Sequence, residues 1–283
     1  MNPLAKSPMI GEARDQQLLG SATTYCYAKI PEGDLNAHFF FPPGFNHKTD
    51  RLAVILFLHG GMWDISAPSQ FIPHCHHFAS RGIIAVTAEY RTQVKFNGGP
   101  EEAAADIKTI ISFLRYHADH MGIDPNKIIV CGAAAGAHGA LCATLHPHED
   151  TAIPSPKPQG LVLFGPVSDT SPRGGIGHEL YSSPKAAKSQ SPLNHLPQKD
   201  LPPCLIFHGE MDRMVPLNQS IKFTKKYSKK RNKCDLIDFR GAGHTFFNFN
   251  SDERNYKITL RSMDYFLVDL EILDPDPLAG EFD

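Results

Sequence analysis

The chain alternates between short apolar runs and longer segments in which apolar residues recur every three or four positions. The short runs, such as Leu52–Leu58, are continuously apolar, which is typical of strands covered on both faces by helices. In the longer segments one side is apolar, as in the helix predicted after Gly99, where Ala103, Ile107 and Ile110 share a face. This alternation predicts a mostly parallel sheet with helices on both faces.

An antiparallel hairpin is predicted before this alternation begins. Its strands are Thr23–Ile30 and Leu35–Phe41, joined by turn-forming residues. The later predicted strands are Leu52–Leu58, Ile83–Ala88, Ile128–Cys131, Leu161–Phe164, Cys204–Phe207 and Asp235–Phe239. Besides a small-residue helix after Ile128–Cys131, helices are predicted at Phe71–Arg81, from Gly99 to Gly122, at Leu217–Tyr227 and at Glu253–Leu270.

The domain organisation predicted for residues 1–283 is a single domain. Residues 1–20 are weakly patterned and are interpreted as an N-terminal arm or a short outer helix. A segment at about 166–203 is rich in Pro, Ser and Gly and predicts a cap or substrate loop after the sixth strand.

Composition narrows the function classes. The net charge of −2 gives no electrostatic reason to expect nucleic acid or an anionic membrane as a partner. No apolar stretch approaches the roughly 18 residues of a membrane span, and Met1–Gln17 lacks the apolar centre of a signal peptide. We therefore expect a cytoplasmic protein, or one from which a signal has been removed. The 6 cysteines are scattered, several of them in apolar runs, and are interpreted as buried free thiols.

The most informative turn follows Ile128–Cys131 and reads Gly132-Ala133-Ala134-Ala135-Gly136. A strand, a sharp glycine-flanked turn and a helix form the nucleophile elbow of α/β-hydrolases, in which the central residue is serine. Here the central residue is Ala134, whose side chain has no hydroxyl and cannot attack a carbonyl. Two interpretations stay open, a natural inactive relative or an enzyme whose serine has been changed to alanine.

Six motifs together resemble an α/β-hydrolase of the esterase/lipase kind, similar to hormone-sensitive-lipase-like and bifunctional feruloyl/acetyl esterases. The resemblance spans about residues 35–270 and implies a mostly parallel eight-stranded sheet with helices on both faces. In chain order the motifs are His59-Gly60-Gly61-x-Trp63, Glu89-Tyr90-Arg91, Gly122-Ile123-Asp124-Pro125, the turn at Ala134, His208-Gly209-Glu210-x-Asp212 and Gly241-x-Gly243-His244.

The resemblance implies a catalytic triad in the order nucleophile, acid, base, with Ala134 in the nucleophile's place, Asp212 as the acid and His244 as the base. Glu210 is the rival acid, because it lies two residues nearer the preceding strand. Both Asp212 and His244 follow predicted strands, where catalytic residues of open parallel sheets lie.

Backbone N–H groups of Gly61, Met62 and Ala135 are the expected oxyanion hole. Trp63 and His59 are assigned to the substrate-binding region. For Trp63 a buried structural role is the alternative, and His59 is expected to brace the glycine-rich loop.

The function that the resemblance implies is that of a serine carboxylesterase acting on short-chain or carbohydrate-linked (acetyl or feruloyl) esters, present here as an inactive serine-to-alanine variant at position 134. The partner is then a small-molecule or carbohydrate ester. Alternatives are an amidase of the kynurenine-formamidase type and a non-catalytic binding protein with a hydrolase fold. No cofactor and no metal are expected, since consecutive histidines such as His76 and His77 point in different directions on a helix. The oligomeric state is not indicated.

Overall fold

The computed structural model describes residues 12–148, 153–173 and 175–276. Its strands are β1 (Thr23–Ile30), β2 (Gly33–Phe40), β3 (Leu52–Leu58), β4 (Ile84–Ala88), β5 (Ile123–Ala133), β6 (Gly160–Phe164), β7 (Cys204–Gly209) and β8 (Cys234–Phe239). Its α-helices are α1 (Glu12–Leu19), α2 (Ile72–Ser80), α3 (Gln93–Phe96), α4 (Pro100–Tyr116), α5 (Ala118–Met121), α6 (Ala134–Leu145), α7 (Pro184–Gln190), α8 (Asn218–Tyr227) and α9 (Glu253–Asp269). Short 3-10 helices are η2 (Pro68–Phe71), η3 (His178–Leu180), η4 (Pro192–His195) and η5 (Ser228–Lys230).

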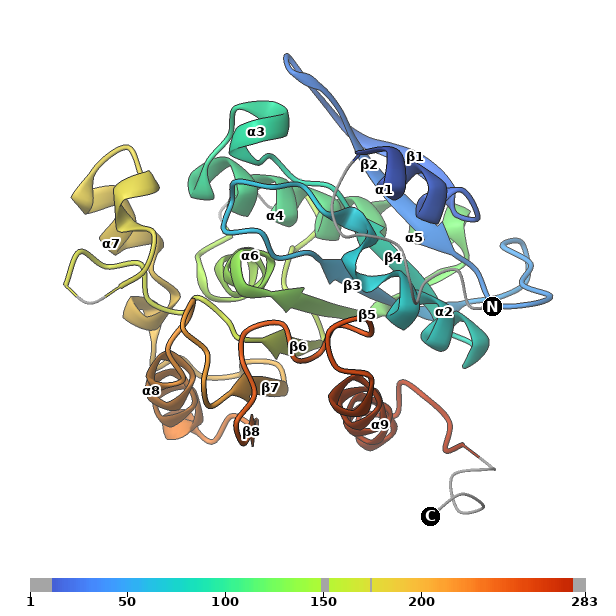
Figure 1. The fold of residues 1–283 in the computed structure, drawn as a ribbon. Helices are drawn as coiled ribbons and strands as arrows, with labels where there is room; N and C mark the ends of the chain where they lie inside the picture. Colours follow the sequence, from blue (N-terminus) through green and yellow to red (C-terminus); the bar gives the residue numbers. More distant parts are fainter. Residues whose placement is uncertain (1–11, 149–152, 174, 277–283) are drawn as a thin grey trace.

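The strands form one 8-stranded sheet in the order β1-β2-β4-β3-β5-β6-β7-β8. The hairpin β1–β2 is antiparallel and joins the sheet through an antiparallel pairing of β2 with β4, whereas the strands from β4 to β8 pair in parallel. Figure 1 shows the hairpin at one end of the sheet and β7 and β8 at the other. The predicted fold class, a mostly parallel eight-stranded α/β sheet, is confirmed.

Each face of the sheet is covered by its own set of helices. Along β3, Val54 and Leu56 pack into a cluster with α4, α6 and α8, whereas Ile55 and Phe57 pack into a second cluster with α2 and α9. Successive side chains of a strand point to opposite faces, so a strand covered on both faces has to be apolar at every position. This explains the uninterrupted apolar runs in the sequence.

Two predicted segments differ in detail from the structure. The single helix expected between Gly99 and Gly122 is two helices, α4 and α5, because the backbone leaves helical geometry at His117. The segment at 166–203, expected to have little regular structure, contains α7, whose first turn is capped by Ser183 through a hydrogen bond from the Ala186 N–H. Residues 1–11 of the predicted N-terminal arm lie outside the described residues, and α1 follows them.

The carboxyl ends of neighbouring parallel strands meet at one edge of the sheet. Ala133 of β5 pairs with Phe164 of β6, which pairs with Phe207 of β7, and Gly209 pairs with Phe239 of β8. The residues that directly follow these strands are thereby brought together, and they include the predicted nucleophile position, acid and base. In the described ranges, no helix is both long and apolar enough to cross a membrane.

Candidate active site

The turn from β5 into α6 has the backbone of a nucleophile elbow. Ala134 has φ 44°, a left-handed conformation that is rare outside glycine and common at strained functional turns. The flanking glycines are required by close packing: a Cβ on Gly132 would lie 2.7 Å from the Ala137 nitrogen, and one on Gly136 would collide with the carbonyl oxygen of His59. Ala134 itself is fully buried.

The predicted acid and base are hydrogen-bonded to each other. His244 Nδ1 lies 2.6 Å from Asp212 Oδ2. The other carboxylate oxygen, Oδ1, accepts the N–H groups of Met214 at 2.8 Å and Val215 at 2.9 Å. An ionised carboxylate can only accept, so Nδ1 of His244 carries the proton and Nε2 is free to accept one.

The charge on Asp212 is stabilised within the fold. Burial alone would raise the pKa of Asp212, but hydrogen bonds from His208, His244 and the Val215 N–H outweigh burial and hold the pKa well below its usual range. The carboxylate therefore stays ionised and can stabilise a positive charge on His244. Glu210, the rival acid, is an exposed residue, and its carboxylate accepts the Gly241 N–H at 3.3 Å.

A second histidine contacts the acid, and no role was predicted for it from the sequence. His208 Nε2 lies 2.8 Å from the Val215 carbonyl oxygen and 3.4 Å from Asp212 Oδ2, and its Nδ1 lies 2.7 Å from the Ser220 hydroxyl. The carbonyl can only accept, so Nε2 is the donor and Nδ1 accepts from Ser220. The one sequence signal was a histidine at the end of an apolar strand, four residues before the acid.

The glycine-rich loop after β3 is held by its carbonyl groups. Tyr90, from the Glu89-Tyr90-Arg91 motif, donates its hydroxyl to the His59 carbonyl at 2.6 Å, and His59 Nδ1 donates to the Gly60 carbonyl at 2.6 Å. The ring of His59 stacks on Tyr90 with centroids 4.3 Å apart, and burial lowers the pKa of His59 to about 4. His59 is therefore neutral and braces this loop.

Fixing these carbonyls also restricts the N–H groups of the same peptides. The C=O and N–H of a trans peptide point in opposite directions, so anchoring the Gly60 carbonyl turns the Gly61 N–H the other way. Gly61 has φ 115° and Met62 has φ 52°. Within the described residues, neither of these two N–H groups has a hydrogen-bond acceptor. The Ala135 N–H lies in the first turn of α6, where no intrahelical acceptor exists.

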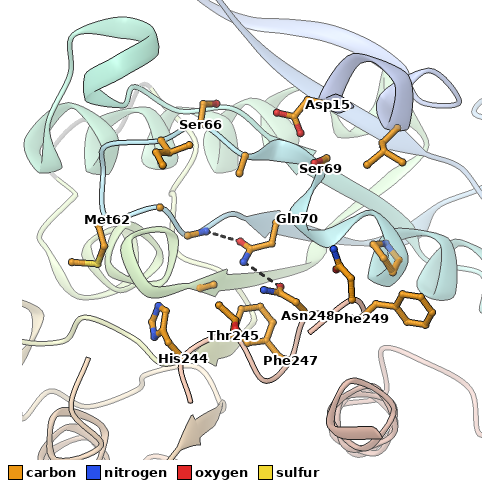
Figure 2. A pocket seen from close by; sticks show the side chains of 18 of the residues that line it. Asp15, Met62, Ser66, Ser69, Gln70, His244, Thr245, Phe247, Asn248 and Phe249 are labelled. Carbon is orange, nitrogen blue, oxygen red and sulfur yellow. Dashed lines mark hydrogen bonds between the residues drawn. The ribbon is translucent and has the colours of Figure 1, made fainter. Parts of the chain in front are cut away.

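A cavity of about 290 Å³ opens beside His244 and the glycine-rich loop. Figure 2 shows Met62, Gln70 and His244 around it, with side chains of η2 on one side and the loop after β8 on the other. The lining is mostly apolar, with a few polar groups. The residues that line it are Asp15, Leu18, Gly60, Gly61, Met62, Ile65, Ser66, Ala67, Ser69, Gln70, Pro73, Ala133, Met214, His244, Thr245, Phe247, Asn248, Phe249 and Asn250.

Trp63 is fully buried and is not among the residues that line this cavity. Its ring lies edge-on to His138, with centroids 5.3 Å apart, and packs beside Gly177. The described residues of the segment at 166–203 contribute none of the lining, which comes instead from α1, η2, Pro73 of α2, Ala133 at the end of β5 and the loops after β3, β7 and β8. In the described part of the chain, no group of three or more His, Cys, Asp and Glu side chains could hold a metal ion.

A mostly parallel eight-stranded sheet with a sharp turn after β5, an aspartate after β7 and a histidine after β8 is the arrangement of an α/β-hydrolase. The chain belongs to the BD-FAE family, whose sequence model matches residues 41–157 and 166–227.

Several known relatives of the chain are esterases. Esterase 2 of Thermogutta terrifontis, in a structure phosphoramylated by tabun, is 36% identical with a TM-score of 0.84, and the match covers 91% of this chain and 98% of that one. A probable carboxylic ester hydrolase of Mycobacterium tuberculosis, LipM, is 27% identical over 70% of this chain and 53% of its own length. An isoprenylcysteine alpha-carbonyl methylesterase of Arabidopsis thaliana is 26% identical over 68% of this chain and 50% of its own. The chain thus spans about half the length of these two curated relatives.

Proposed function

We propose that this chain carries the active site of a serine carboxylesterase for short-chain or carbohydrate-linked esters, with Ala134 in the place of the nucleophilic serine. The observation that carries the proposal is the Asp212–His244 pair beside a glycine-rich loop in which two N–H groups have no acceptor among the described residues. A protein that only binds ligands has no need of an ionised acid, a correctly protonated histidine and an oxyanion loop at one site.

With a serine at position 134, the proposed reaction runs through an acyl-serine. The serine Oγ attacks the ester carbonyl while His244 Nε2 takes the hydroxyl proton, and the N–H groups of Gly61, Met62 and Ala135 bind the oxyanion. The histidine then gives its proton to the leaving alcohol, and an acyl-serine remains. Water, deprotonated by the same histidine, hydrolyses the acyl-serine to the acid and restores the serine.

The size and lining of the cavity favour small substituents. A volume of about 290 Å³ suits a short acyl group or one small ring better than a long lipid chain. Solved forms of the Thermogutta esterase contain propionate and butyrate, which supports short acyl groups for this chain as well. Ser69 and Asn248 supply polar groups at the cavity wall for carbohydrate hydroxyls.

One observation favours a second function, a protein that binds esters without hydrolysing them: position 134 is alanine. With no Oγ, the chain as it stands should bind an ester and leave it intact, apart from the weak catalysis that an oxyanion hole gives by itself. An amidase of the kynurenine-formamidase type would use the same residues on an amide bond, so amides belong in the test.

The test is to compare the chain with its Ala134→Ser variant. Substrates are p-nitrophenyl acetate, butyrate and octanoate, an acetylated xylo-oligosaccharide, methyl feruloate and an N-formyl aromatic amide. We expect the variant to hydrolyse the short esters fastest and the parent chain to leave them intact. Diethyl p-nitrophenyl phosphate should release one equivalent of p-nitrophenol per chain of the variant and none from the parent. Adding His244→Ala to the variant should abolish both reactions.

If the Ala134→Ser variant hydrolyses the formyl amide faster than the esters, the proposed activity becomes that of an amidase. A folded Ala134→Ser variant that attacks neither the esters, the amide nor the phosphate would refute the catalytic proposal. Binding of intact esters by the parent chain would then be measured calorimetrically to test the second function.

A further inference from the structure

A chain of hydrogen bonds through Gln70 joins the glycine-rich loop to the loop that carries His244. The Gly60 N–H donates to Gln70 Oε1 at 2.7 Å, and Gln70 Nε2 donates to Asn248 Oδ1 at 3.2 Å. Gln70 lies in η2 and Asn248 lies four residues after His244. Figure 2 shows both bonds along the wall of the cavity, between the loop after β3 and the loop after β8.

The orientation of both side-chain amides follows from the backbone. A backbone N–H can only donate, so Gln70 has to present its oxygen to Gly60. Its nitrogen is then directed at Asn248, which has to present an oxygen in turn. A flip of either amide would place two donors or two acceptors face to face, so the arrangement has a single satisfied form.

This chain completes the support of one peptide group. The peptide between His59 and Gly60 is held at its carbonyl by the Tyr90 hydroxyl, at 2.6 Å, and at its N–H by Gln70. With both ends fixed, the peptide cannot rotate about the neighbouring bonds of the flexible glycines. The next two N–H groups, those of Gly61 and Met62, belong to the proposed oxyanion hole and take their direction from it.

We propose that Gln70 is a positioning residue which, together with Asn248, sets the oxyanion loop at a fixed place relative to the loop of His244. The catalytic part of this inference rests on the proposed function. The structural part does not, since the same contacts are present in the chain with alanine at position 134. Two loops that are far apart in sequence have to meet a single substrate carbon, and Gln70 is the side chain that bonds to both.

The structural part is tested in the unmodified chain by hydrogen–deuterium exchange. Gln70→Met keeps the length of the side chain and removes the acceptor of the Gly60 N–H, so exchange of that amide, followed in a peptide that covers residues 59–62, should accelerate roughly tenfold or more. Asn248→Leu should accelerate it less. The control is Gln93→Met, since Gln93 donates to Asn97 at 2.9 Å in an exposed Gln–Asn pair of the same kind. It should leave residues 59–62 unchanged. Equal exchange in Gln70→Met and the parent chain would overturn the inference.

The catalytic part is tested in the Ala134→Ser background with p-nitrophenyl acetate. A displaced donor weakens binding of the transition state more than binding of the ester, so Gln70→Met should lower kcat roughly ten- to hundredfold and change KM less than about threefold. Because the two amides act in series, adding Asn248→Leu to Gln70→Met should cost little more. Gln93→Met should match its parent.

The results separate the two proposals. If Ala134→Ser is inactive, the proposed function fails, and the exchange experiment alone decides whether Gln70 holds the loop. If Ala134→Ser is active but Gln70→Met changes only KM or thermal stability, Gln70 is a packing residue and its positioning role is refuted. If the losses in kcat from Gln70→Met and Asn248→Leu multiply fully in the double variant, the two amides act independently and do not form one connection.

Discussion

Replacement of Asp212 by asparagine should leave the fold in place and remove most of the activity of the Ala134→Ser chain. The new side chain would offer its oxygen to the N–H groups of Met214 and Val215, which already donate to Oδ1 of the aspartate. Its amide nitrogen would then face His244 Nδ1, now 2.6 Å from the carboxylate. That nitrogen is a donor, so His244 would have to accept at Nδ1 and carry its proton on Nε2.

The magnitude follows from this change of tautomer. A histidine protonated at Nε2 cannot take the serine proton, and the same substitution in a known serine protease triad lowers kcat about 10⁴-fold. A loss of that size corresponds to about 5.4 kcal/mol of transition-state stabilisation. The neutral amide keeps the two bonds from the Met214 and Val215 N–H groups and leaves no buried charge unpaired, so the free energy of unfolding should change less than this.

The assay is kcat for p-nitrophenyl acetate, with far-ultraviolet circular dichroism and urea unfolding as checks of the fold. Glu210→Gln is the matched control, because it makes the same carboxylate-to-amide change at an exposed residue two positions away. It should retain full activity. If Asp212→Asn stays within tenfold of its parent, or if Glu210→Gln is the inactive variant, the assignment of the acid is wrong.

Three further predictions concern stability and the support of the acid. Burial lowers the pKa of His74 to about 3, from 6.5 for a free imidazole. Stability from the neutral His74 ring is therefore complete above pH 6.5 and is lost as the pH falls toward 3. Between pH 8 and pH 5 this loss lowers the free energy of unfolding by about 2 kcal/mol, and His74→Phe should abolish that part of the decrease in urea unfolding. Gly136→Ala should lower the melting temperature strongly, because its Cβ would collide with the His59 carbonyl, whereas Gly243→Ala, with open space around it, should not. In Ala134→Ser, His208→Leu should lower kcat roughly tenfold and stability by about 2 kcal/mol, and a loss of stability alone would exclude a role for His208 in orienting Asp212.

The strands of the sheet could be predicted from the sequence because a strand that is buried on both faces is apolar at every position. Ile83–Ala88 and Leu161–Phe164 were predicted within one residue of β4 and β6 for this reason. Asp212 and His244 were located through the motifs that resemble the esterase/lipase family, and the shared edge of the parallel strands explains why residues far apart in the chain lie together there. Their roles in catalysis remain predictions.

The contacts that support the site could not be predicted in this way. The bond between Gln70 and Asn248 joins side chains 178 positions apart, and neither lies in a motif or at the end of a strand. The direction of the Trp63 ring also depends on tertiary structure, since Trp63 has φ 63° in an irregular loop. Periodicity describes regular elements only, and these residues lie in a short 3-10 helix and in loops.

The elbow keeps its shape without a reactive side chain at its centre. Ala134 at φ 44° carries a strain of order 1 kcal/mol that glycine would avoid, so packing of the strand, helix and glycine-rich loop around it has to hold the turn. That packing is provided by the backbone contacts of Gly132 and Gly136, which do not involve the side chain at 134. Serine differs from alanine by one oxygen, which would project from a Cβ that is already placed. The two chains should therefore share one site, and any difference in ester turnover between them can be attributed to the presence of that oxygen.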